Sequence, residues 1–325
     1  MNQIIGIDLG GTKCAVILGQ LDESSHPTVM GKSVVPTKNY PDPYRMIEKL
    51  QHEMEKLLQS HQVEIKTVAS IGISCGGPLD SVRGVILSPP NLPGWNEIPI
   101  VKLFVEKYGI PTAIQNDANA CALAEWKFGA GRGTRNMIFL TFGTGLGAGL
   151  ILDGKLYAGT NDNAGEVGHI RLDNYGPVGY GKSGSFEGFC SGGGIAQLAR
   201  LKVMEKLQMG GKVSWCQSAS DLADITAQKV AEAANAGDTI AREVFDICGD
   251  YLGKGISVLI DILNPECIVI GSIYVRAGHL LTHSIEQALQ AEALPLARKV
   301  CRIVPAELDE QIGDTASLSV AANLL

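Results

Sequence analysis

Residues 3–18 read Gln-Ile-Ile-Gly-Ile-Asp-Leu-Gly-Gly-Thr-Lys-Cys-Ala-Val-Ile-Leu, and this stretch decides the fold. Its two apolar segments predict strands that are joined by the turn Gly10-Gly11-Thr12-Lys13. The two glycines let backbone N–H groups approach an anion, and Thr12 and Lys13 add a hydroxyl and a positive charge. A plain hairpin turn is the simpler explanation. A Rossmann fingerprint is disfavoured, because the chain re-enters a strand instead of opening a helix.

The same pattern returns in the middle of the chain. A predicted strand over 136–141 is followed by Phe142-Gly143-Thr144-Gly145-Leu146-Gly147 and by a second strand over 148–152. This is an internal repeat of strand, glycine-rich turn and strand. Two such hairpins that faced each other would hold a polyphosphate from both sides.

Between the two hairpins, Asn116-Asp117-Ala118-Asn119 follows an apolar strand and opens a helix over 120–128. Asp117 and Asn119 are candidates for the helix cap, which is the simpler interpretation of this junction. Open α/β sheets bind ligands beyond the carboxyl ends of their strands, so Asp117 is also a candidate catalytic base.

These motifs, with Ala164-Gly-Glu-Val-Gly-His169, resemble in their order the ROK family of bacterial sugar kinases, repressors and related proteins. The resemblance extends from Gly6 to Ala316. It implies an α/β, actin-like or hexokinase-like ATPase fold, in which two lobes with duplicated phosphate hairpins surround a central cleft. We expect an N-terminal lobe over 1–117, with a C-terminal helix over 312–325 packed on it, and a C-terminal lobe over 118–311.

The resemblance also assigns roles to residues. Asp117 is the catalytic base, and the sugar-contacting residues are Gly77, Asn91, Asn116, Asp117, Glu166, His169 and Glu187. The residues assigned to ATP are Asp8, Gly10, Gly11, Thr12, Lys13, Gly143, Thr144, Gly145, Gly147 and Gly271. Asp8 is expected to organise Mg²⁺ through water or phosphate, because this ion keeps several of its waters. A second glycine usually follows Gly271 in the family, and here the residue is Ser272.

One motif of the family is missing. Many ROK proteins bind a structural zinc ion through three cysteines and the histidine of the motif at 164–169. This chain has Val178, Tyr180 and Ser185 at the cysteine positions. We therefore predict that zinc is absent, that His169 serves the sugar alone, and that packing holds the loop carrying Glu187.

Composition narrows the function further. The 325 residues carry a net charge of −7, and no cluster of Lys and Arg suggests a nucleic-acid partner. No apolar run is long enough for a membrane helix, and the start lacks the pattern of a signal peptide. The eight cysteines contain no C-x-x-C pair and are interpreted as reduced core residues. We expect a cytoplasmic protein with small-molecule partners, and the family resemblance implies a homodimer.

The sequence thus predicts an ATP-dependent kinase that phosphorylates a hexose hydroxyl, the 6-hydroxyl of glucose or a related aldohexose. N-acetylglucosamine and N-acetylmannosamine remain open as substrates, because loop geometry distinguishes these sugars. A non-catalytic sugar-binding or sugar-sensing protein is the rival from another class. A DNA-binding repressor is disfavoured, since no helix-turn-helix domain precedes Asp8.

Overall fold

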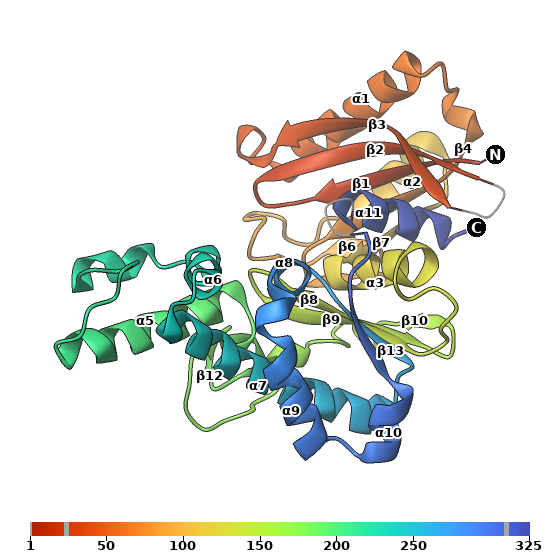
Figure 1. Ribbon diagram of the computed structural model, residues 1–325. Coiled ribbons are helices and arrows are strands. Elements are labelled where there is room, and N and C mark those ends of the chain that lie inside the picture. Colours follow the sequence, from red (N-terminus) through yellow and green to blue (C-terminus); the bar gives the residue numbers. More distant parts are fainter. Residues whose placement is uncertain (1, 23–25, 309–311) are drawn as a thin grey trace. The chain divides into compact units, whose positions relative to one another are not determined.

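The computed structural model describes residues 2–22, 26–308 and 312–325 (Figure 1). The chain divides into two compact units. The first comprises residues 1–135, 149–164 and 307–325, and the second comprises 136–148 and 165–306. The chain therefore first passes from one unit into the other after Arg135, whereas the sequence predicted that the N-terminal lobe ends at Asp117. The helix that starts at Asp117 belongs to the first unit because it packs on the C-terminal helix.

The first unit is built on a sheet with the strand order β3-β2-β1-β4-β7. Its strands are β1 (Gln3–Leu9), β2 (Lys13–Leu21), β3 (Pro27–Pro36), β4 (Val68–Cys75) and β7 (Thr112–Asn116). Its helices are α1 (Pro43–Ser60), α2 (Ile100–Tyr108), α3 (Asp117–Phe128) and α11 (Ile312–Ala322), and a small hairpin pairs β5 (Leu79–Asp80) with β6 (Val85–Ile86). The first three strands are antiparallel, while β1, β4 and β7 run parallel.

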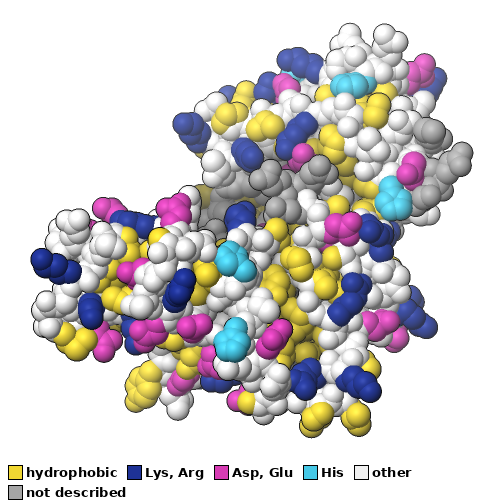
Figure 2. All heavy atoms as spheres, viewed as in Figure 1, with side chains coloured by type: hydrophobic (Ala, Val, Ile, Leu, Met, Phe, Trp, Pro, Cys, Tyr) yellow, Lys and Arg dark blue, Asp and Glu magenta, His cyan; other side chains and the backbone are white. Residues whose placement is uncertain are grey.

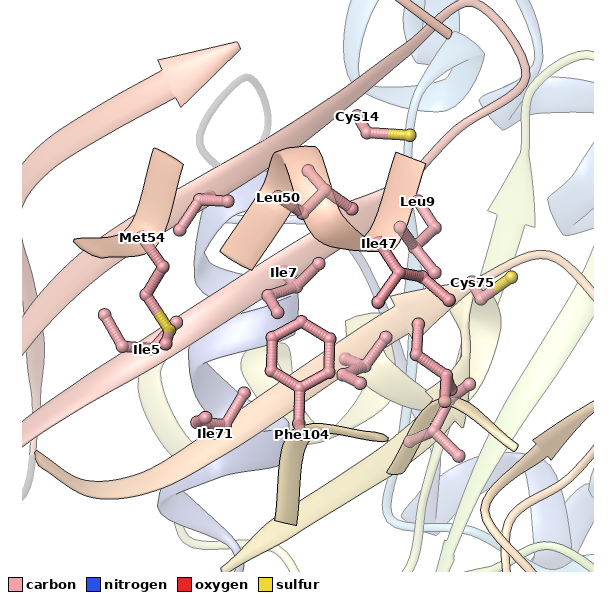
Figure 3. Packing of buried hydrophobic residues seen from close by; sticks show 14 of the residues in the cluster. Ile5, Ile7, Leu9, Cys14, Ile47, Leu50, Met54, Ile71, Cys75 and Phe104 are labelled. Carbon is pink, nitrogen blue, oxygen red and sulfur yellow. The ribbon is translucent and has the colours of Figure 1, made fainter. Parts of the chain in front are cut away.

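Both faces of this sheet are covered. Because side chains alternate along a strand, Ile5 and Ile7 of β1 join the core beneath α1 and α2, with Phe104 of α2 close by (Figure 3). Ile4 lies in a separate cluster with α11. On that face, a Cβ at Gly6 would lie 2.3 Å from Ser317 Oγ, so this glycine is needed for α11 to pack closely.

The second unit carries most of a sheet with the order β10-β9-β8-β13-β14. The strands of this sheet are β8 (Met137–Phe142), β9 (Leu146–Leu152), β10 (Lys155–Tyr157), β13 (Cys267–Ile270) and β14 (Arg302–Pro305), of which β10 and residues 149–152 of β9 fall in the first unit. The helices are α4 (Phe186–Phe189), α5 (Gly192–Gln208), α6 (Ala227–Asn235), α7 (Thr239–Leu263), α8 (Ile273–Ala277), α9 (Thr282–Glu292) and α10 (Pro295–Val300). A short hairpin joins β11 (Val178–Gly179) to β12 (Lys182–Ser183).

Local residues set the start of two elements. The strand β14 begins only at Arg302, because Pro295 opens the helix α10 before it. The helix α6 begins after Thr226, which caps it by accepting a hydrogen bond from Lys229 N. Within the described ranges, no helix combines the length and apolar character that crossing a membrane requires.

Candidate active site

Register brings the predicted site residues of the first unit to one edge of its sheet. Leu9 pairs with Cys75, and Cys75 pairs with Asn116, so the parallel strands β1, β4 and β7 end side by side. The first glycine hairpin, the Gly76-Gly77 turn and Asp117 follow these three strand ends directly. This edge is where open α/β sheets bind ligands.

Asn91 lies between two of these turns. A Cβ at Gly11 would be 2.6 Å from Asn91 O, and a Cβ at Gly76 would be 3.0 Å from Asn91 Nδ2. Gly77 has no neighbour within 4 Å of an ideal Cβ. The assignment of Gly77 to the sugar stays a prediction, and it is Gly76 that lies close to Asn91.

The tip of the first hairpin is fixed through its backbone. Gly10 N donates to Lys13 O, Thr37 N donates to Thr12 O, and the Thr37 hydroxyl donates to Gly10 O at 2.6 Å. The side chains of Thr12 and Lys13 stay exposed. The Thr12 hydroxyl and the Lys13 ammonium group therefore lie on a turn whose backbone is fixed by hydrogen bonds, close to Asp8 in the chain.

Asn116 is the cap of α3, which corrects the prediction that named Asp117 or Asn119. The Asn116 side chain accepts a hydrogen bond from Asn119 N at 2.7 Å, and Asp117 is the first residue of the helix. Asp117 Oδ1 accepts from Ala118 N at 2.8 Å. Since Asn116 performs the capping, the Asp117 carboxylate is not required for it.

The environments of Asp117 and Asp8 both favour the protonated form. The carboxyl of Asp117 is reached by solvent but closely surrounded by protein, and this desolvation raises its pKa. The pKa of Asp8 is raised to about 6, first by burial and then by the negative charge of Asp314, while Lys32 opposes the rise. Asp117 adds a further negative charge near Asp8. A cation or a proton donor would relieve this concentration of carboxylates.

In the second unit, Glu187 of α4 contacts the second hairpin. Its Oε2 accepts a hydrogen bond from Leu146 N at 3.0 Å, and a Cβ at Gly145 would lie 2.8 Å from the same oxygen. The base of the hairpin is held by Thr141, whose hydroxyl accepts from Gly147 N at 2.8 Å. The predicted sugar residue Glu187 and the predicted phosphate turn thus lie together, with Gly145 and Gly147 shaping the turn.

The motif over 164–169 lies along β9, the second strand of this hairpin. Ala148 N donates to Gly165 O at 2.7 Å, and Glu166 and His169 flank a single helical turn that follows. The ring of His169 meets the edge of the Tyr180 ring, with centroids 5.3 Å apart. Lys182 Nζ donates to His169 O at 2.6 Å. Glu166, His169 and Glu187 are therefore gathered around β9.

The residues at the family's cysteine positions do not fit a zinc ion. Val178 offers no donor atom, the Tyr180 ring packs on His169, and the Ser185 hydroxyl accepts from Gly188 N as the cap of α4. Cys190 is buried, which raises its thiol pKa well above the usual range and disfavours the thiolate that binds metal. Zinc absence in the purified protein stays a prediction.

Protein contacts hold this loop instead. The Gln197 side chain of α5 forms two hydrogen bonds with the backbone of Val178: it accepts from Val178 N at 3.0 Å and donates to Val178 O at 2.9 Å. The Phe189 ring stacks on Tyr251 of α7 at 3.5 Å, and the Tyr251 hydroxyl donates to Asp173 at 2.5 Å. The sequence predicted that packing would hold this loop, but gave no sign of Gln197 or Tyr251.

A cavity of about 800 Å³ lies in the second unit beside the start of the second hairpin. Its lining residues are Gly143, Thr144, Gly192, Gly193, Ala196, Ile225, Thr226, Ala227, Gln228, Ala231, Phe245, Ser272, Ile273, Arg276 and Ala277. The volume is within the range of small-molecule and cofactor pockets. Gly271 precedes the lining residue Ser272 and packs against Phe139.

Sequence reasoning missed most of this cavity. Thr226, Gln228, Phe245 and Arg276 come from α6, α7 and α8 or their caps, and no local pattern connects them. The sequence signals that pointed to this place were the turn residues Gly143 and Thr144 and the departure from glycine at Ser272.

The chain matches the model of the ROK family over residues 4–323. It belongs to the ROK family. A glucokinase from Halalkalibacterium halodurans is 33% identical over 293 residues, which cover 90% of this chain and 86% of that protein. The DNA-binding transcriptional dual regulator NagC of Escherichia coli is 29% identical over 303 residues, covering 91% of this chain and 72% of the regulator.

Solved structures agree with this assignment. The ROK family glucokinase from Streptomyces griseus, solved in complex with glucose and AMPPNP, has a TM-score of 0.75 and 27% identity. The alignment covers 99% of this chain and 100% of that one. The protein therefore has the actin-like, hexokinase-type fold that the sequence predicted, within a family that includes both sugar kinases and repressors.

Proposed function

We propose that this ROK protein is an ATP-dependent sugar kinase that phosphorylates a hexose hydroxyl, the 6-hydroxyl of glucose or a related aldohexose. The observation that carries the proposal is the placement of Asp117. Asp117 follows the end of β7, at the same sheet edge as the first glycine hairpin, and Asn116 rather than Asp117 caps α3. A general base needs a carboxylate oxygen that can accept a proton, and the helix cap does not require the carboxylate of Asp117.

Asp117 would accept the proton of the attacking hydroxyl. Its raised pKa makes Asp117 a stronger base than an aspartate with the ordinary pKa, and brings that pKa closer to neutral pH. Sugar hydroxyls both donate and accept hydrogen bonds, which suits amides and carboxylates. We assign Gly77, Asn91 and Asn116 of the first unit to sugar binding, together with Glu166, His169 and Glu187 of the second.

The nucleotide would bind in the cavity of the second unit and at the second hairpin, and the first hairpin offers a phosphate-type turn of the same kind. Backbone N–H groups of the glycine turns suit phosphate oxygens, and the cavity has the size of a nucleoside site. Gly143 and Gly192 line that cavity, so the backbone can approach a ligand closely there. Bound ATP would supply the phosphoryl group, while Asp117 and the hairpins orient the reactants and offset developing charge.

Asp8 fits an indirect magnesium ligand. The negative charges of Asp314 and Asp117 act on it, so a divalent cation is electrostatically favoured at this edge. Among the residues the structure describes, however, no three acidic, histidine or cysteine side chains form a metal-binding cluster. Asp8 would therefore hold Mg²⁺ through water or phosphate, and the ion would neutralise phosphate charge.

A coupled ADP-release assay over a panel of hexoses and N-acetylhexosamines tests the proposal. A sugar-dependent release of ADP with glucose or a related aldohexose supports it. Turnover only with N-acetylglucosamine or N-acetylmannosamine would support the kinase activity but assign it a different substrate. The similarity to the NagC regulator makes sugar sensing the rival function, and tight sugar binding without any ADP release would favour that rival.

A further inference from the structure

The cavity of the second unit has an uneven distribution of charge. Among the described residues that line it, Arg276 is the one with a charged side chain. The others are small, apolar or neutral polar residues, so the lining itself places no negative charge against the guanidinium. A ligand that fills this cavity therefore meets a single positive charge.

A specific contact holds the guanidinium at the hairpin side of the cavity. Arg276 Nη2 donates to Ser272 Oγ at 3.1 Å. A Cβ built at Gly143 would lie 3.4 Å from the same Ser272 oxygen, which is the distance of van der Waals contact. Ser272 thus lies against the first glycine of the second hairpin and ties Arg276 to it.

Ser272 keeps this hydroxyl in a backbone conformation that favours glycine. Its φ is 54° and its ψ is −107°, outside the regions that residues with a Cβ usually adopt. Such strain persists only where the surrounding structure holds it, and it gathers at functional sites. The hydroxyl that a glycine would lack is the one that accepts the hydrogen bond from Arg276.

We infer that Arg276, oriented by Ser272, is a phosphate-binding residue for the nucleotide in this cavity. A guanidinium has five N–H donors, and the contact with Ser272 leaves others for phosphate oxygens. The glycine turn supplies neutral N–H donors, so Arg276 adds the formal charge that separates a nucleoside di- or triphosphate from a nucleoside. This inference rests on the proposed function, because it presumes a nucleotide in the cavity.

Calorimetric titration of the full chain with ADP and with adenosine tests the inference. We expect Arg276→Gln to weaken ADP binding about tenfold and to leave adenosine binding within about twofold, because only ADP presents phosphate. The weakening of ADP binding by added salt should also become less steep. Lys299→Gln is the matched control: it removes one exposed cation from α10, outside the cavity lining, and should change neither affinity.

Ser272→Gly separates orientation from folding. Glycine suits the positive φ, so this variant should melt no lower than the wild type while it binds ADP about threefold more weakly. Equal ADP affinity in the wild type and Arg276→Gln would overturn the inference about Arg276 but would not contradict the proposed kinase function. Equal losses of ADP and adenosine affinity would also overturn it, because Arg276 would then contact the nucleoside. A wild-type protein that binds neither ligand would instead refute the proposed function.

Discussion

Replacing Asp8 by asparagine should stabilise the protein while it impairs phosphoryl transfer. The pKa of Asp8 is raised from 3.8 to about 6, chiefly by burial and by the charge of Asp314. The folded state therefore binds the proton more tightly than the unfolded chain. The contribution of Asp8 to stability is therefore most favourable below pH 4, falls as the pH rises through 6, and stays reduced above it.

The size of the effect follows from that elevation. A rise from 3.8 to about 6 corresponds to roughly 3 kcal/mol against the ionised form. Asp8 is partly exposed, so we expect a gain of about 1–3 kcal/mol for Asp8→Asn at pH 7.5. The gain should shrink below about 1 kcal/mol at pH 4, because that pH lies close to the unfolded pKa of 3.8 and Asp8 is almost fully protonated in the folded wild type.

Thermal melts of the two proteins at pH 7.5 and pH 4 measure this difference. Asp153→Asn is the control, because the Asp153 side chain is 86% exposed and its loss should change stability by less than about 0.5 kcal/mol. A destabilised Asp8→Asn variant at pH 7.5, or a gain of the same size at both pH values, would refute the electrostatic reasoning.

Three further predictions concern the second unit. Glu187→Ala should raise the sugar KM about tenfold or more, because it removes a carboxylate and frees Leu146 N; an unchanged sugar KM would exclude Glu187 from the sugar site. Metal analysis should find no stoichiometric zinc, and chelators should leave the melting temperature unchanged, since Val178 stands where a cysteine would bind; about one zinc per chain would contradict this. Gln197→Ala should cost about 1–2 kcal/mol and raise the sugar KM more than the ATP KM, because it releases the loop that carries Glu187; equal changes in both KM values would reduce Gln197 to a general structural role.

Local patterns in the sequence predicted the parts of the site that lie at strand ends. The glycine turns after β1 and β8 and the junction at Asp117 are short signals, and strand register brings the first and last of these to the same edge of the sheet. The cap of α3 was assigned to the wrong residue. Asn116, Asp117 and Asn119 all favour caps, and only the backbone geometry of Asn116 selects among them.

The cavity could not be predicted in the same way. Its walls come from helices that are distant in the sequence, and their lining residues are mostly alanine, isoleucine and glycine, which carry no chemical signature. The unit boundary after Arg135 was missed for a related reason, because it depends on the packing of α3 against α11. Charge also escapes local patterns: Asp314 raises the pKa of Asp8 from the far end of the chain. Figure 2 shows cationic and anionic side chains interspersed over the visible face, in keeping with the small-molecule partners that composition suggested.

If Asp117 is the general base of a sugar kinase, the variant Asp117→Asn should lose phosphoryl transfer. Single-turnover measurement of this transfer is the direct test. The purified wild type and variant are each mixed with ATP, Mg²⁺ and the sugar that supports turnover, and sugar phosphate is followed by ³¹P NMR or rapid quench. Sugar affinity is measured separately by calorimetry. The account predicts a loss of about 10²–10⁴ in the transfer rate with sugar affinity largely kept, which is the usual contribution of a positioned base. A variant that transfers phosphate at a near-normal rate would contradict it.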